Sequence, residues 1–261
     1  MSKVSIATLA EAPLVAPPPG VTGQIESRAL FDTAEDPIHA HVHTLARDAV
    51  AQIGPSDTDC VGYVWKGAVE AGGRRLAAGS SLVVERGAVV QIRGDEQSSQ
   101  VLIFHGARPS DEPRAGGHVH LLPTERVRRA QGLGAPGVVG ALHANAACPT
   151  CKVWMHENHL PPREPAPEDA AKGVHAHSEN EVIFVVEGEL RFGTRALAPG
   201  SAIAIAADAF YTIGPGPTGL KIVNFRAGLP TEIRFKGGEA IDEVGLWREI
   251  AAPDYLEPLA S

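Results

Sequence analysis

The sequence has few aromatic residues and no long uninterrupted apolar run. Aromatic side chains make up 5% of the 261 residues, whereas there are 28 glycines and 21 prolines. Frequent glycine and proline favour many short strands joined by tight turns over a bundle of long helices. No apolar stretch is long enough to cross a bilayer as a helix. The sequence therefore predicts a β-rich protein with no membrane partner.

Basic residues and cysteines are also scarce. The chain has 23 Lys and Arg against 31 Asp and Glu, a net charge of -8. Such a chain is a poor match for a nucleic acid or an anionic membrane surface. Three cysteines, an odd number, cannot make a disulfide framework, and the first twenty residues do not have the pattern of a signal peptide. We therefore predict a cytoplasmic protein that binds no nucleic acid.

Two segments of the chain repeat one pattern of strands and turns. Residues 63–92 align with residues 184–213, so that Gly67 matches Gly188 and Gly79 matches Gly200. An internal repeat of this kind predicts two copies of one β unit. The predicted organisation is an N-terminal arm (1–25), a first barrel (26–112), a second barrel (113–230) and a C-terminal tail (231–261).

The strongest chemical motif is the segment GVHAHSENEVIFVVEG, residues 173–188. His175 and His177 are two residues apart, so in a strand their side chains share one face. Glu181 follows after a short turn and can fold back beside them. Two imidazoles and a carboxylate are a ligand set for a divalent transition metal.

These residues resemble the two sequence motifs of the cupin family. The first motif is matched by His175, His177, Glu181 and Gly188. The second is matched by Pro199 and Gly200, with Tyr211 where the family usually has a histidine ligand. The resemblance implies an all-β protein, a bicupin, with two cupin-type double-stranded β-helix (jelly-roll) barrels in tandem.

The resemblance also implies one divalent transition metal per chain: Fe, Mn, Ni or Zn. Its predicted ligands are His175, His177, Glu181 and Tyr211. Glu181 and Tyr211 are the candidate catalytic residues, and Tyr211 either ligates as a phenolate or stays neutral as a proton donor. The matching positions in the first repeat are Gly54, Ser56, Cys60 and Val90. Because these cannot hold such a cation, only the second barrel is expected to carry the metal.

Alternation along the strands predicts the substrate pocket. Counting from Glu181 places Ile183 and Val185 on the inner face of the second barrel. His156, or Asn158 beside it, faces the mouth from the preceding strand. An apolar pocket with a few polar groups suits a small organic molecule.

Other histidines and cysteines are given structural roles. His39, His41 and His43, like His118 and His120, alternate along a strand without an obvious carboxylate, and we expect them on a solvated or interface face. Cys148 and Cys151 form a C-x-x-C pair, which needs further ligands to hold zinc; His143 and His156 are the candidates. The favoured interpretation is that both cysteines are ordinary buried residues.

The sequence thus predicts a metal-dependent enzyme acting on a small molecule, in the first place a dioxygenase-type oxidoreductase. One alternative is a hydrolase or isomerase resembling the ureidoglycine aminohydrolase type of bicupin. Another is a non-catalytic cupin that binds a small ligand. Exposed edge strands and the family resemblance also imply a homodimer.

Overall fold

A computed structural model describes residues 3–107, 117–131, 136–145, 148–164, 173–248 and 250–257. In this part of the chain strands predominate, with one short α-helix, α1 (Glu243–Leu246), and one 3-10 turn (Thr124–Arg126). None of the described helices is long and apolar enough to cross a membrane. The predicted all-β fold class is confirmed.

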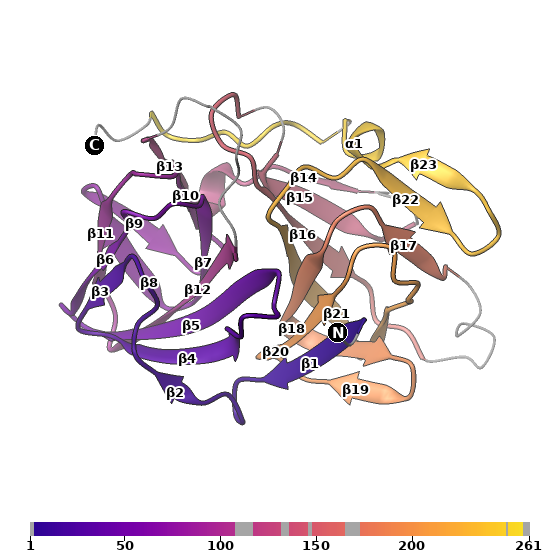
Figure 1. Cartoon of the computed structure of the whole chain (residues 1–261), viewed down its shortest axis with the longest axis horizontal. Coiled ribbons are helices and arrows are strands. Elements are labelled where there is room, and N and C mark those ends of the chain that lie inside the picture. The colour runs from indigo at the N-terminus through magenta and orange to yellow at the C-terminus, as the bar shows by residue number, and fades with distance from the viewer. Residues whose placement is uncertain are drawn as a thin grey trace.

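The first barrel consists of two sheets that enclose an apolar core (Figure 1). Its strands are β2 (Leu14–Val15), β3 (Val21–Gly23), β4 (Glu26–Phe31), β5 (Ile38–Ala46), β6 (Val50–Ile53), β7 (Cys60–Lys66), β8 (Ala68–Ala71), β9 (Arg74–Ala77), β10 (Ser81–Val84), β11 (Val90–Gly94), β12 (Ser98–Gly106) and β13 (Val119–Leu122). The larger sheet has the order β13-β10-β7-β12-β5-β4-β2, and the smaller β3-β6-β11-β8-β9.

The second barrel repeats this plan with a larger and a smaller sheet. Its strands are β1 (Val4–Thr8), β14 (Arg129–Gln131), β15 (Val139–Ala144), β16 (Trp154–Leu160), β17 (His175–His177), β18 (Glu181–Phe192), β19 (Arg195–Leu197), β20 (Ser201–Ile205), β21 (Gly214–Arg226), β22 (Glu232–Phe235) and β23 (Ala240–Asp242). The larger sheet has the order β1-β20-β18-β21-β16-β15-β14, with β19 on β18. The smaller sheet is β17-β22-β23.

Each barrel contains a strand whose residues were predicted to lie outside that barrel. β1, within the segment expected to be an arm, pairs with β20 of the second barrel, where Val4 lies opposite Ile205. Its apolar residues Val4 and Ile6 pack against the core of that barrel. β13, within the segment expected in the second barrel, pairs with β10 of the first. The boundary expected near residue 112 lies outside the described residues.

The two barrels share an apolar core between them. Phe225 of β21 stacks on Phe104 of β12, with ring centroids 5.2 Å apart. Trp65 of β7 meets Phe184 of β18 edge-on at 5.0 Å, and its indole N–H donates to the carbonyl of Val186 at 3.2 Å. The outer face of the β18–β21 sheet is therefore used for packing, and its inner face is left for a site.

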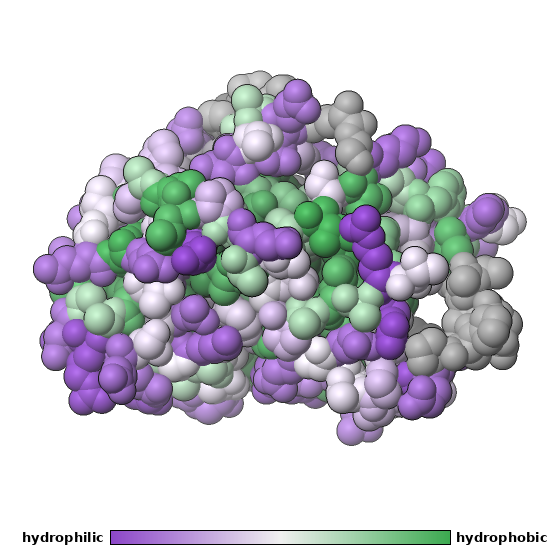
Figure 2. All heavy atoms as spheres, turned by 90° about the horizontal axis from the view of Figure 1, so that it is seen from below, coloured by the Kyte–Doolittle hydropathy of each residue, from purple (hydrophilic) through white to green (hydrophobic). Residues whose placement is uncertain are grey.

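The large apolar side chains that are exposed in the described residues are scattered: Leu14, Val50, Val89 and Phe210. Figure 2 shows small apolar groups among polar ones on the face seen from below. Isolated apolar residues of this kind are normal on a protein surface and do not by themselves mark an interface. The homodimer stays a prediction.

Candidate metal centre

Backbone pairing brings three of the predicted ligands together in the second barrel. His175 and His177 form the ends of β17. The backbone N–H of each of His175 and Tyr211 donates to the carbonyl of the other at 2.9 Å. The Tyr211 ring centroid lies 4.7 Å from that of His175 and 6.1 Å from that of His177. The two motifs therefore meet through this bridge.

Both imidazoles are held at Nδ1. His175 Nδ1 lies 2.6 Å from the carbonyl oxygen of Gly173, and His177 Nδ1 lies 2.8 Å from Oε2 of Glu243. The carbonyl of Gly173 only accepts, so this hydrogen bond places the proton of His175 on Nδ1 and leaves its Nε2 a lone pair. His177 Nδ1 also lies 3.0 Å from Arg226 Nη2, which only donates, so this nitrogen lies between an acceptor and a donor. Metal-binding histidines are commonly oriented by such an outer acceptor.

Glu181 supplies a buried carboxylate beside them. Its Oε2 accepts hydrogen bonds from Asn224 at 2.6 Å and from Arg226 Nη2 at 3.1 Å, and lies 4.0 Å from His177 Nε2. Its Oε1 has no hydrogen-bond partner in the described part of the chain. Burial alone would raise the pKa of Glu181, but the neighbouring His177 and Arg226 lower it. Glu181 is therefore ionised and has one oxygen available.

Arg226 and Glu243 complete the centre, and sequence reasoning missed both. The Arg226 guanidinium is fully buried, and its Nη1 lies 2.6 Å from Glu243 Oε1. Glu243 opens α1 in the C-terminal tail. A signal for Arg226 was present, because this charged residue directly follows Phe225 in a segment that also contains Ile222 and Val223. Glu243 gave no such signal, since only tertiary packing brings the tail to the motif.

The residues fit a divalent cation. The two carboxylates Glu181 and Glu243 face the guanidinium of Arg226 and the imidazole of His177. A buried carboxylate oxygen without a partner is costly, and a bound cation would satisfy it. The donor atoms of His175, His177 and Glu181 are not all within 4.8 Å of one another in the described structure.

The predicted pocket residues are divided between two environments. Ile183 and Val185 belong to the same apolar cluster as Tyr211. His156 is instead packed among aromatic rings: its Nδ1 accepts a hydrogen bond from Trp154 Nε1 at 3.0 Å, and its ring lies 4.3 Å from that of Trp247. Burial holds the pKa of His156 well below its ordinary value. This neutral, enclosed imidazole lies in a packed layer and not at an open mouth.

The histidines of β5 and the pair His118 and His120 were expected to have no carboxylate nearby, but each group has a carboxylate within hydrogen-bond distance of one imidazole. His41 Nε2 lies 3.2 Å from Asp32 Oδ2, and His120 Nε2 lies 2.7 Å from Glu85 Oε1. His41 and His43 are buried. The solvated alternative is therefore wrong for His41 and His43, which share the β5 face of core residue Leu45. His120 lies against Cys148 at the junction of the barrels, as the interface alternative allows.

Replacing Tyr211 by Phe is expected to weaken metal binding about tenfold without abolishing it, as loss of an outer hydrogen-bond partner does. In the metal-free protein, burial and the negative charge of Glu181 raise the pKa of Tyr211 well above its ordinary value, so the expected role is that of a neutral proton donor. Competition with a chromophoric chelator measures the affinity. The matched control is Tyr63→Phe, since the Tyr63 hydroxyl donates to Glu157, away from this centre. Complete loss of binding in Tyr211→Phe alone would identify a phenolate ligand and contradict this expectation.

Comparison with known proteins supports the fold. No protein-family model and no curated protein matches the sequence. The structure of the protein Ylba from Escherichia coli matches with a TM-score of 0.64 at 14% identity, covering 86% of this chain and 90% of that one. A candidate dioxygenase from Nostoc punctiforme matches with a TM-score of 0.61 at 11% identity, covering 86% and 83%.

A third match binds a metal. The pirin YhhW from Escherichia coli, in complex with nickel(II), matches with a TM-score of 0.55 at 12% identity, covering 87% of this chain and 99% of that one. Identities this low establish the arrangement of strands and not the activity. The chain therefore has the bicupin fold that its two sequence motifs predict.

Proposed function

We propose that this protein is a metal-dependent bicupin enzyme that binds one divalent transition metal in its second barrel and oxidises a small organic molecule, as a dioxygenase does. The observation that carries the proposal is how three side chains are held: two imidazoles and one carboxylate. His175 and His177 are both anchored at Nδ1, and Glu181 has a buried oxygen without a described partner. Such a set fits Fe, Mn, Ni or Zn. The nickel(II) bound by the matching pirin and the matching candidate dioxygenase support it.

His175, His177 and Glu181 would hold the metal, and Tyr211 would stand beside it. A bound iron ion would supply oxygen activation, with coordination positions left open for substrate and oxygen. Arg226 keeps Glu181 ionised, and Glu243 fixes the orientation of His177. Tyr211 keeps its phenolic proton and can donate it to an oxygen of the substrate.

The surroundings suit a small substrate. Ile183 and Val185 make the interior beside Tyr211 apolar, which excludes water from the centre. The cavity of about 590 Å³ that reaches Glu181 is a separate space, because residues 29–33, 35–38 and 204–206 line most of it and His175, His177 and Tyr211 are not among its lining residues.

Replacing His177 by Ala is expected to remove about one metal ion per chain, because a facial set of three ligands does not survive the loss of its most buried imidazole. Elemental analysis of protein purified without added metal measures the loss. The control is His159→Ala on β16, whose imidazole contacts Glu157 instead. Equal metal content in wild type and His177→Ala would remove the basis of the proposal.

The reaction is tested by oxygen uptake. Iron-loaded wild type is expected to consume oxygen with an aromatic diol or a β-diketone, and iron-treated His177→Ala is not. Ammonia release from ureido compounds without oxygen uptake would overturn the oxidoreductase in favour of the hydrolase alternative. Tight binding of such compounds without turnover would overturn it in favour of a binding protein.

A further inference from the structure

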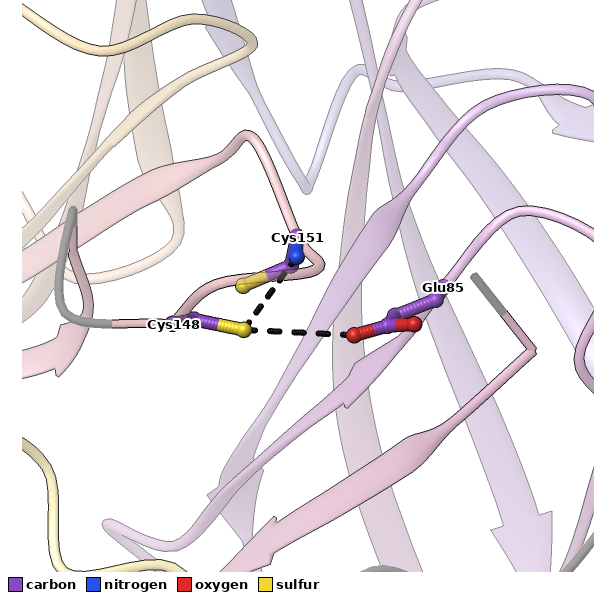
Figure 3. Close-up of side chains that lie close together, drawn as sticks. All are labelled: Glu85, Cys148 and Cys151. Carbon is purple, nitrogen blue, oxygen red and sulfur yellow. Dashed lines mark hydrogen bonds between the residues drawn. The ribbon is translucent and has the colours of Figure 1, made fainter. Parts of the chain in front are cut away.

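Four metal-binding side chains meet at the junction of the two barrels, away from the centre described above. Figure 3 shows Glu85, Cys148 and Cys151 pointing toward one another. All three are buried, and their donor atoms lie within 4.8 Å of one another. His120 of β13 adds a ring nitrogen, with Nε2 2.7 Å from Glu85 Oε1 and 3.8 Å from Cys148 Sγ.

We propose that Glu85, His120, Cys148 and Cys151 form a second metal site that binds Zn²⁺ and joins the two barrels. Glu85 follows β10 of the first barrel and His120 belongs to β13, which pairs with β10. Both cysteines come from the segment between β15 and β16 of the second barrel. Four protein ligands of the S, N and O types form a closed tetrahedral set, as in structural zinc sites.

The donor atoms of Glu85, Cys148 and Cys151 lie within 4.8 Å of one another, and His120 Nε2 is close to the first two of them. Tetrahedral Zn²⁺ with a bond of about 2.3 Å to sulfur and about 2.0 Å to nitrogen or oxygen places these donors roughly 3.5 Å apart. Cys148 Sγ lies 3.8 Å from His120 Nε2 and 3.9 Å from Glu85 Oε1. The contact of 2.7 Å between His120 and Glu85 is a hydrogen bond, and it would lengthen by roughly 0.6 to 0.8 Å when both groups bind the ion.

The two cysteines are held beside each other, because the backbone N–H of Cys151 donates to Cys148 Sγ at 3.2 Å. When Zn²⁺ binds, each sulfur forms one bond to the ion as a thiolate, and any thiol proton leaves to solvent, with no electron transferred.

Neighbouring residues already hold the ligand loops in place. Asp59 Oδ1 accepts the backbone N–H of Arg86 at 2.8 Å, next to Glu85, and Asp59 Oδ2 accepts that of Lys152 at 2.9 Å, next to Cys151. One buried carboxylate therefore fixes a loop from each barrel. Hydrogen-bonding groups that hold the ligand segments in place commonly accompany metal sites.

The C-terminal segment closes the site. The Tyr255 ring lies 5.0 Å from that of His120, and its hydroxyl donates to the carbonyl of His143 at 2.8 Å. Four protein ligands under such a cover leave no open position for a substrate. The role is therefore to hold the two barrels together, unlike that of the centre at His177.

The test uses reduced full-length protein without a metal-binding tag and Co²⁺ as the probe. Wild type, His177→Ala and Cys60→Ala are expected to show thiolate-to-cobalt charge-transfer absorption, because Cys60 lies outside the cluster. Cys148→Ser and Cys151→Ser are expected to lose that absorption and about one zinc ion per chain. The centre at His177 contains no thiolate. Loss of the thiolate absorption therefore reports on the cysteine site alone, and loss of metal in His177→Ala reports on the first centre.

A second measurement needs no variant. Zinc release from native wild type by a thiol reagent is expected to follow the modification of Cys148 and Cys151, and excess zinc is expected to protect both thiols. Cobalt binding without thiolate absorption in folded wild type would overturn the proposal. A Cys148–Cys151 disulfide in native protein that takes up no zinc after reduction would also overturn it, in favour of a redox pair.

Discussion

Replacing Arg226 by Met is expected to lower the free energy of unfolding by about 3 to 5 kcal/mol, the cost of leaving buried charges without their partner. The Arg226 guanidinium lies 3.1 Å from Glu181 Oε2 and 2.6 Å from Glu243 Oε1, and all three side chains are almost completely buried. Without it, two carboxylates face each other across His177 with no fixed cation. Urea unfolding in the presence of a chelator measures the loss, because bound metal would offset part of it.

Arg234→Met is the matched control. Arg234 pairs with Asp208 and Glu232, but these side chains are well exposed, so its removal is expected to cost less than about 1 kcal/mol. The double variant Arg226→Met/Glu243→Gln is expected to recover part of the lost stability, because only one buried carboxylate, that of Glu181, then lacks its partner. A loss for Arg226→Met no larger than for Arg234→Met would show that Arg226 does not balance the centre.

The part of the centre that local patterns could predict is the set of ligands close together in the chain. The spacing of His175 and His177 fixes their common face, and the family motif placed Tyr211 beside them, where the bridge between the two backbones lies. The same alternation placed Ile183 and Val185 in the interior. The period of a strand was enough for the histidines and for Ile183 and Val185, whereas Tyr211 needed the family resemblance.

The part that could not be predicted comes from segments far apart in sequence. Glu243 reaches His177 only because the tail docks as β22 against β17. Glu85 lies 63 residues before Cys148, and neither segment alone indicates the other. His143 and His156, the partners expected for the cysteine pair, contact Ser81 and Trp154 instead. A C-x-x-C pair is therefore a weak signal until the strands of two barrels are placed.

Replacing Phe225 by Ala is expected to lower the free energy of unfolding by about 3 to 5 kcal/mol, the usual cost of removing a buried aromatic ring. Phe225 is fully buried, and its ring stacks on Phe104 at 5.2 Å across the junction of the barrels. The cavity cannot close by a local shift, because rigid strands form both walls. Urea unfolding measures the loss, and Phe210→Ala, which removes a largely exposed ring, is the control with an expected change within about 0.5 kcal/mol.

Phe225→Ala also separates stability from chemistry. Phe225 lies between Asn224 and Arg226 in β21, and alternation turns these two neighbours to the inner face, where both contact Glu181. The variant is therefore expected to keep the metal content of wild type while losing stability, and His177→Ala is expected to lose the metal of that centre. If Phe225→Ala lost that metal while remaining folded, the two faces of β21 would not be independent, and the junction between the barrels would itself support the centre.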